Sequence, residues 1–232
     1  VATVLLFFTS LKKCRPDGKY WNKRVATQIS TLGGKFFFIQ VMLMIINSTN
    51  ELIITNIYGP QYVVEYQIYY KIFYLVVTML SLITNPIWSN VSVAYSMKNF
   101  DWIRKIRLQL KKVSYIASIG LVLLVFMFPK LSEIWLGEKN IIYNYKIGML
   151  DAFYCITMIK VLTETVIANG INLLKMQMIF FTIGAVLRIP IVIICSIANI
   201  QWESVVIANI IVLLPFVIAQ ERDIQKNLIN WR

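Results

Sequence analysis

Apolar residues run along this chain in long blocks separated by short polar connections. The stretches 72–97, 113–129 and 204–220 contain no charged residue, and a helix crosses a bilayer with roughly 17–25 apolar residues. The blocks predict six spans, at residues 36–58, 69–95, 113–135, 147–168, 176–200 and 204–220. Because the runs are apolar on nearly every side and do not alternate with a period of two, we expect helices and not barrel strands.

The composition fits this pattern and narrows the chemistry. Hydrophobic residues make up 58% of the 232 residues and charged residues 15%, against roughly 45–50% and 25% in soluble domains. The sequence contains no histidine, the commonest general base and metal ligand. Its cysteines, Cys14, Cys155 and Cys195, show neither a disulfide framework nor a metal spacing. We therefore expect an all-α membrane protein with no catalytic residue, cofactor or metal site.

Basic residues gather in alternate connections. Residues 11–35 hold seven Lys or Arg and residues 94–112 hold six, whereas the connection between them, 56–66, holds none. Lys and Arg accumulate on the cytoplasmic side of membrane proteins. Placing the first, third and fifth connections and the tail in the cytoplasm puts seventeen basic residues inside and three outside. Topology thus explains most of the net charge of +12, and no nucleic-acid partner is implied.

The two ends of the chain and one connection complete the predicted topology. Residues 1–9 are apolar but follow neither a methionine nor a basic segment, so we expect the end of a truncated transmembrane helix. A short ordered lead segment is the alternative. Phe100, Ile103, Ile106 and Leu110 recur at helical spacing among basic residues. We expect residues 99–112 to lie along the inner leaflet as a connector, or alternatively as a lipid sensor. The ring residues Tyr58, Tyr62 and Tyr66 are expected to anchor one interface.

Polar residues recur along single faces of two neighbouring spans. The first span carries Gln40, Asn47, Glu51 and Thr55, and the second carries Lys71, Thr78, Asn85 and Ser92 at intervals of seven. Such seams have two interpretations. They either form hydrogen bonds between helices, worth about 0.6 kcal/mol each, or they line a water-filled cavity for a hydrophilic substrate.

Charged residues inside the spans sharpen this choice, because a charge at mid-bilayer costs at least about 2.5–3.5 kcal/mol. Lys160 and Glu164 lie one turn apart and can pair with each other. Lys71 and Arg188 have no acidic residue one turn away, so we expect them in the cavity. Glu51 is expected to bind a cation or proton, or to pair with Lys71. The candidate substrate-binding residues are therefore Lys71, Arg188, Asn47, Glu51, Asn85, Lys160 and Glu164.

Several short motifs resemble one known family. They are Gly59-Pro60 with Tyr66, residues 85–89 from Asn85 to Ser89, Ala94-Tyr95 with residues 99–103, and Asn169-Gly170. These motifs, together with helix order and loop length, resemble the O-antigen and capsular polysaccharide flippases of the multidrug/oligosaccharidyl-lipid/polysaccharide exporter superfamily. Residues 59–103 carry the resemblance most specifically.

The resemblance implies a two-lobe exporter whose second lobe is this chain. Residues 10–35 would then be the basic cytoplasmic linker between lobes, 36–220 the six-helix C-terminal lobe, and 221–232 a cytoplasmic tail. The expected substrate is an undecaprenyl-diphosphate-linked oligosaccharide, flipped across the bacterial inner membrane for lipopolysaccharide, capsule or exopolysaccharide assembly. Lys71 and Arg188 would contact its diphosphate or sugar headgroup. The expected partners are this substrate, membrane lipids, the N-terminal lobe of the same polypeptide and components of a polysaccharide polymerase.

Three other functions were weighed against this one. A drug antiporter of the same superfamily would use a membrane-embedded acid for cation coupling, and Glu51 fits that role, but the charged cavity candidates are mainly basic. A membrane-embedded enzyme of polysaccharide assembly would need paired carboxylates or histidines, which the short connections do not offer. A structural scaffold would leave the aligned polar seams unexplained.

Overall fold

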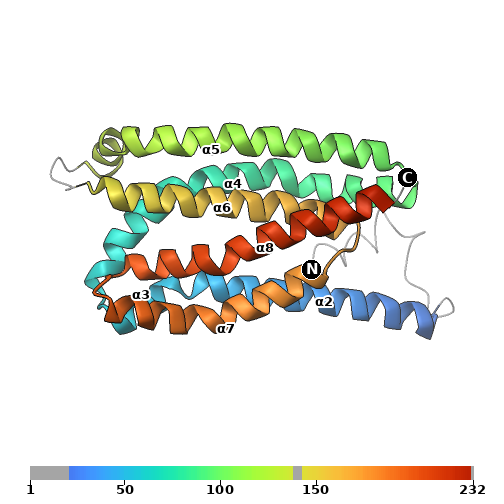
Figure 1. Ribbon diagram of the computed structural model, residues 1–232, viewed down its shortest axis with the longest axis horizontal. Coiled ribbons are helices and arrows are strands. Elements are labelled where there is room, and N and C mark those ends of the chain that lie inside the picture. Colours follow the sequence, from blue (N-terminus) through green and yellow to red (C-terminus); the bar gives the residue numbers. More distant parts are fainter. Residues whose placement is uncertain (1–20, 138–142, 231–232) are drawn as a thin grey trace, which may run out of the picture. The chain divides into compact units, whose positions relative to one another are not determined.

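The described part of the chain consists of helices and turns without a β-strand. The structure is a computed structural model, and it describes residues 21–137 and 143–230. The helices are α2 (Lys23–Ser48), α3 (Asn50–Ile57), α4 (Gln61–Ser96), α5 (Phe100–Leu136), α6 (Tyr145–Gly170), α7 (Lys175–Ile197) and α8 (Glu203–Asn230). Figure 1 shows their order along the chain.

Five helical stretches are long and apolar enough to cross a membrane. They are Lys23–Ile57, Gln61–Ser96, Phe100–Ile134, Lys175–Ile197 and Glu203–Leu228, among the described residues. Large apolar side chains such as Leu82, Ile116 and Ile194 are exposed on them, as expected for surfaces that face lipid. These helices confirm the predicted all-α membrane fold, and the chain is a multi-pass membrane protein.

The chain divides into two compact units, Val1–Phe37 and Phe38–Arg232. In the first unit the described residues form the start of α2, where the side-chain oxygen of Asn22 accepts a hydrogen bond from the backbone of Arg24 at 3.0 Å. The predicted helix end at 1–9 lies outside the described residues. Part of the predicted linker, 23–35, is helical, and the predicted tail continues α8 as far as Asn230.

Within the second unit, α6 occupies the centre. It packs against α4, α5 and α8, and α7 packs on the far side of α8 (Figure 1). Most residues of α6 between Ile147 and Gly170 are buried. This position explains why α6 can carry Glu164, whose side chain faces another helix and a charged partner, Arg107, and not lipid.

The expected inner-leaflet connector is wrong as a separate element. Residues 100–112 are the first part of α5, which continues without a break to Leu136. Asn99 begins this helix by accepting a hydrogen bond from the backbone of Trp102 at 3.2 Å. The apolar face of the segment is covered by protein, because Ile103 and Leu110 join a core cluster with residues of α4, α6 and α8.

Turn chemistry fixes the connection between α3 and α4. Gly59 adopts a φ of 105°, a conformation that side chains rarely tolerate, and its amide donates to the carbonyl of Ile54 at 3.1 Å. Pro60 then precedes the first residue of α4, Gln61, as its N-cap, where its fixed φ and missing N–H donor are tolerated. Tyr66, expected at the membrane interface, is instead buried, and Asn50 donates a hydrogen bond to its hydroxyl at 2.8 Å.

Candidate functional site

A polar groove lies between α2, α4 and α6. It has a volume of about 180 Å³. Its lining combines apolar side chains with an amide, a phenol and three hydroxyl groups, those of Asn47, Tyr74, Thr78, Ser81 and Thr165. We call this feature the polar groove. It contains one residue from each of the seams that the sequence predicts on the first two spans, Asn47 and Thr78, whereas the other seam residues lie outside its lining.

The hydroxyl groups of the polar groove are satisfied by their own helices. Thr78 donates to the carbonyl of Tyr74 at 3.1 Å, Ser81 to that of Thr78 at 2.7 Å, and Thr165 to that of Val161 at 2.7 Å. A hydroxyl that donates in this way keeps its lone pairs. The lining can therefore accept hydrogen bonds from a ligand without losing any of its own.

Aromatic rings extend from the polar groove along α4. Tyr74 stacks on Tyr70 with ring centroids 4.7 Å apart, and Tyr70 stacks on Tyr66 at 5.4 Å. On the opposite wall, Tyr154 donates a hydrogen bond to Asn47 at 3.0 Å. Rings beside hydroxyl and amide groups offer both an apolar face and polar contacts, a combination that binds amphipathic ligands.

Lys71 and Asn85 of α4 lie outside the lining of the polar groove, and Lys71 borders a separate pocket with Leu124 and Leu131 of α5. Lys71 and Asn85 are exposed, as are Thr78 and Ser92 of the same seam. Glu51 of α3 is also exposed, but it accepts a hydrogen bond from Gln67 at 2.9 Å and not from Lys71. The expected pairing of Glu51 with Lys71 is therefore wrong, because Gln67 lies one turn nearer to Glu51 on α4.

Arg188 lies in a buried network at the break between α2 and α3. Only 1% of its surface is exposed. It donates to the carbonyl of Ile45 at 3.0 Å, to the hydroxyl of Thr49 at 2.6 Å and to the side-chain oxygen of Asn50. Arg188 thus has no acidic partner in this network, but three neutral acceptors on the α2–α3 segment satisfy its guanidinium group.

The same network reaches α4 and α8. Asn209 donates to Asn50 at 3.1 Å, and Asn50 donates to Tyr66 at 2.8 Å. A helix that breaks at Thr49 exposes backbone carbonyls that need donors in a membrane. Arg188 supplies such a donor, so its geometry favours holding α2, α3, α4, α7 and α8 together over contacting a substrate.

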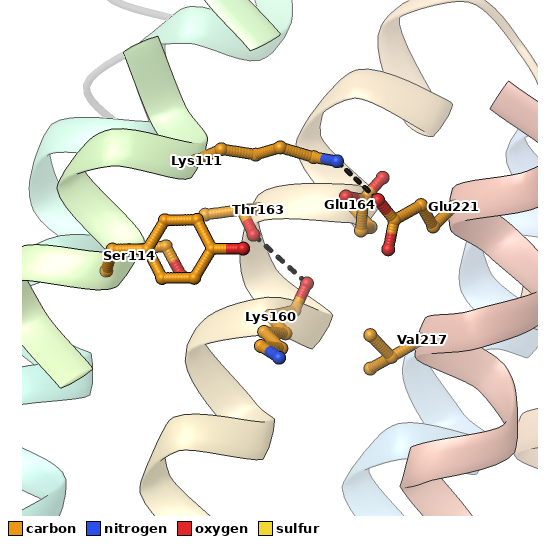
Figure 2. A pocket seen from close by; sticks show the side chains of 8 residues that line it. Lys111, Ser114, Lys160, Thr163, Glu164, Val217 and Glu221 are labelled. Carbon is orange, nitrogen blue, oxygen red and sulfur yellow. Dashed lines mark hydrogen bonds and ion pairs between the residues drawn. The ribbon is translucent and has the colours of Figure 1, made fainter. Parts of the chain in front are cut away.

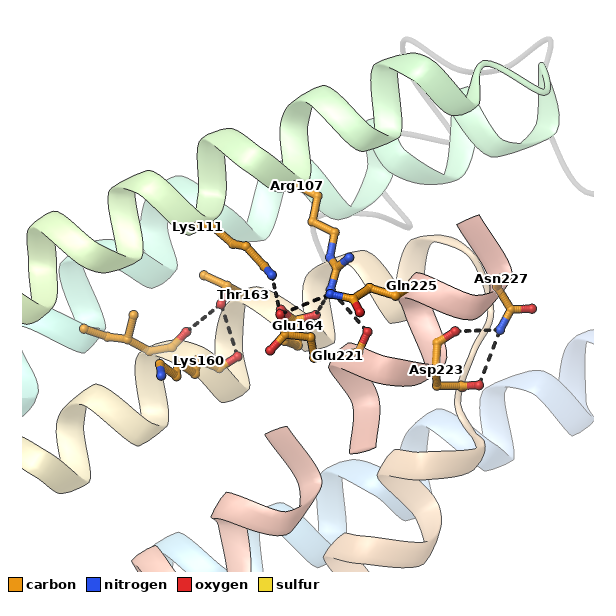
Figure 3. A network of polar contacts seen from close by, with 10 residues as sticks. Arg107, Lys111, Lys160, Thr163, Glu164, Glu221, Asp223, Gln225 and Asn227 are labelled. Carbon is orange, nitrogen blue, oxygen red and sulfur yellow. Dashed lines mark hydrogen bonds and ion pairs between the residues drawn. The ribbon is translucent and has the colours of Figure 1, made fainter. Parts of the chain in front are cut away.

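Glu164 pairs with a residue that the sequence did not suggest. Its carboxylate lies 3.3 Å from the guanidinium of Arg107 on α5, and both side chains are buried. Lys160, the expected partner one turn away, is exposed. In Figures 2 and 3 its amine points away from Glu164.

A small cavity of about 50 Å³ adjoins this pair. Figure 2 shows Lys111 of α5 reaching Glu221 of α8 at its edge, with the hydroxyl of Thr163 donating to the carbonyl of Lys160 at 3.1 Å. Arg107 also donates to the backbone carbonyl of Glu221 at 3.3 Å. Figure 3 shows how these contacts tie α5, α6 and α8 together. We call this set the ionic network.

The sequence alone did not identify the partners that form ion pairs in the ionic network. Arg107, Lys111 and Glu221 lay in predicted connections or the tail, although each is within a helix. Asp151 was also passed over, although a carboxyl inside an apolar run is itself a signal. Among the described residues, no group of three or more His, Cys, Asp or Glu could hold a metal ion.

The long apolar helices and the buried polar networks define an all-α multi-pass membrane protein with a polar groove on one side of its bundle. Comparison with models of protein families, with curated proteins and with solved structures finds no match. The family that the motifs suggest therefore stays a prediction.

Proposed function

We propose that this chain forms one lobe of a flippase that moves an undecaprenyl-diphosphate-linked oligosaccharide across the bacterial inner membrane. The product would serve O-antigen, capsule or exopolysaccharide assembly. The observation that carries the proposal is the polar groove, where the ring of Tyr74, an amide and three hydroxyl groups stand among apolar side chains, a lining that suits an amphipathic sugar-lipid. The resemblance of residues 59–103 supplies the substrate class.

The charges of the lobe are consistent with an anionic headgroup. Lys71 on α4 and Lys160 on α6 are exposed, although both lie outside the lining of the polar groove: Lys71 borders a separate pocket against α5, and Lys160 borders the small cavity beside Glu164. The ammonium group of a lysine is a compact positive charge that pairs well with a phosphate group. We assign the diphosphate to these two residues and not to Arg188, whose guanidinium already donates to three acceptors.

The second lobe that the resemblance implies would cover the polar groove from the other side. Alternating access then requires the two lobes to separate on one face of the membrane at a time. The lipid tail would stay in the bilayer while the headgroup passes along α4.

The test uses the complete protein in bacteria that lack their own flippase. We expect it to restore surface polysaccharide, whereas Thr78→Trp and Ser81→Trp, which fill the polar groove, should abolish restoration. Met79→Trp is the matched control, because Met79 lies on the same helix but is exposed away from the groove. Equal amounts of each variant in the membrane are required.

Two outcomes count against the proposal. One is that the complete protein, although present in the membrane, restores no polysaccharide from any of several donor strains. The other is that the two groove variants restore it as well as Met79→Trp does. Export of cationic drugs in place of polysaccharide would favour the antiporter.

A further inference from the structure

The carboxyl group of Asp151 is buried and has no hydrogen-bond partner among the described residues. It lies on α6 and has 0% of its surface exposed. Neither of its oxygens accepts a hydrogen bond from any described residue. An isolated ionised carboxylate in such surroundings is so costly that the group takes up a proton instead.

Among the described residues, the groups that interact electrostatically with Asp151 carry no positive charge. Those that interact with it electrostatically are Tyr66 and Tyr69 of α4, Tyr143 just before α6, Cys155 of α6, and Glu203 at the start of α8. Burial raises the pKa of Tyr143, so its phenol is neutral. Glu203 itself has a buried oxygen without a donor, and a neighbouring acid disfavours a second negative charge.

Arg188, a buried cation of the same unit, already has other partners. Arg188 is buried but directs its guanidinium to Ile45, Thr49 and Asn50. Asp151 differs in this respect from Glu164, the other buried acid of α6, which has Arg107 at 3.3 Å (Figure 3). Of the two buried carboxyl groups of α6, that of Glu164 has a positively charged partner, whereas that of Asp151 has no hydrogen-bond partner among the described residues.

A proton fits this site better than a metal ion does. Hard cations require about six oxygen ligands, and the described residues provide no cluster of three or more metal-binding side chains. A proton needs one oxygen. We propose that Asp151 is a proton-binding site, protonated while α4, α6 and α8 are packed as in this structure, and that it releases its proton to water when this packing opens.

This site links the packing of the bundle to pH. Because the packed state holds one proton that an open, hydrated state does not, a low pH favours the packed state and a rising pH destabilises it. The inference goes beyond the proposed function, since it requires no particular substrate. A proton gradient would then bias the two conformations of whatever transporter contains this lobe.

Infrared spectroscopy of the purified complete protein in liposomes tests the proposal. We expect a carbonyl-stretch band of a protonated carboxylic acid at neutral pH, and its disappearance in Asp151→Asn. Glu164→Gln is the matched control and should keep the band, because the guanidinium of Arg107 at 3.3 Å favours the charged form of Glu164. Isotope labelling of aspartate carboxyl groups should shift the band in the unmutated protein, which needs no variant to fold.

Three results would overturn the proposal: no such band in the unmutated protein, a band that aspartate labelling leaves in place, or a band that persists in Asp151→Asn. Loss of the band on adding sodium chloride, but not choline chloride, would replace the proton by a metal cation and also contradict it. Flippase activity plays no part in these readouts, so they stand apart from the test of the proposed function.

Discussion

Arg188 and Arg107 are both buried, but they satisfy their guanidinium groups in different ways. Arg188 donates to a backbone carbonyl, a hydroxyl and an amide oxygen, all neutral. Arg107 faces the carboxylate of Glu164 and a backbone carbonyl. Arg188 therefore depends on the planar fork of its donors, whereas Arg107 depends on a partner charge.

Replacing Arg188 by lysine should destabilise the protein although the charge is kept. The three donors of a lysine ammonium diverge from one nitrogen on a shorter side chain, so they cannot reach the acceptors that the planar guanidinium spans, and each buried polar group left unpaired costs about 1–3 kcal/mol. We expect Arg188→Lys to lower the thermal midpoint in detergent clearly. Lys71→Met, at an exposed position on α4, should leave it nearly unchanged. Equal midpoints for the two variants would show that the network around Arg188 does not hold the bundle.

The ion pair between Arg107 and Glu164 should behave as a unit. Removing one partner leaves a buried charge, so Glu164→Gln or Arg107→Met should each cost about 3–5 kcal/mol, and the double variant less than their sum. The pair Arg104–Asp101 is the control, since Asp101 is largely exposed, and Asp101→Asn should cost less than about 1 kcal/mol. Unfolding midpoints of the four variants provide the cycle, and additive effects at Arg107 and Glu164 would argue against the pair.

At this scale the sequence predicts which residues are unusual but not what they contact. Lys71, Arg188 and Glu164 stand out because charges are rare in apolar runs. Their surroundings depend on helix packing: Glu164 contacts Arg107, which is 57 residues away, and not Lys160 one turn away. Local spacing considers only neighbours on one helix, so a partner on another helix is invisible to it.

At the scale of elements, apolar runs predict helices well because each run must satisfy its own backbone in lipid. The predicted spans at 69–95 and 176–200 correspond to α4 and α7, with ends displaced by several residues. The break at Thr49 and the continuity of α5 were not predicted. Both depend on tertiary contacts, those of Arg188 with Ile45 and of Ile103 with the core cluster.

The contact between α4 and α6 should depend on the absence of a side chain at residue 170. A Cβ atom built on Gly170 would lie 2.6 Å from the Cβ of Val91 and 3.2 Å from the carbonyl oxygen of Trp88. Because valine is branched there and a backbone oxygen is fixed, Gly170→Ala should destabilise the protein by about 1–3 kcal/mol.

Gly120 provides the control for this prediction. It lies within α5 with open space around the position of a Cβ, so Gly120→Ala should be neutral or stabilising by about 0.5–1 kcal/mol through helix propensity. Thermal midpoints of both variants in one detergent give the comparison. A Gly170→Ala protein as stable as the unmutated one would mean that α4 and α6 are not in close contact.

At the scale of the whole molecule, the second unit gathers many of its lysines at one end. Antiparallel helices bring the start of α5, the start of α7 and the end of α8 to one end, where Arg104 donates to the carbonyl of Leu228 at 2.6 Å (Figure 1). That end carries Lys98, Lys105, Lys112, Lys175 and Lys226. At the other end, Tyr58 bonds Ser204 at 2.7 Å and Trp202 donates to Glu65 at 3.0 Å.

This arrangement predicts the orientation in the membrane. By the bias of Lys and Arg toward the cytoplasm, single cysteines at Lys98 and Lys226 should react with a membrane-impermeant maleimide only after the cells are opened. Cysteines at Gln61 and Gln201, exposed at the other end, should react in intact cells. These cysteines are introduced into the complete protein in which Cys14, Cys155 and Cys195 are replaced by serine or alanine. A further variant, Thr78→Cys, reports whether the reagent enters the polar groove. Since all four end positions are exposed in the structure, a label that reaches Lys98 in intact cells but not Gln61 would invert the topology.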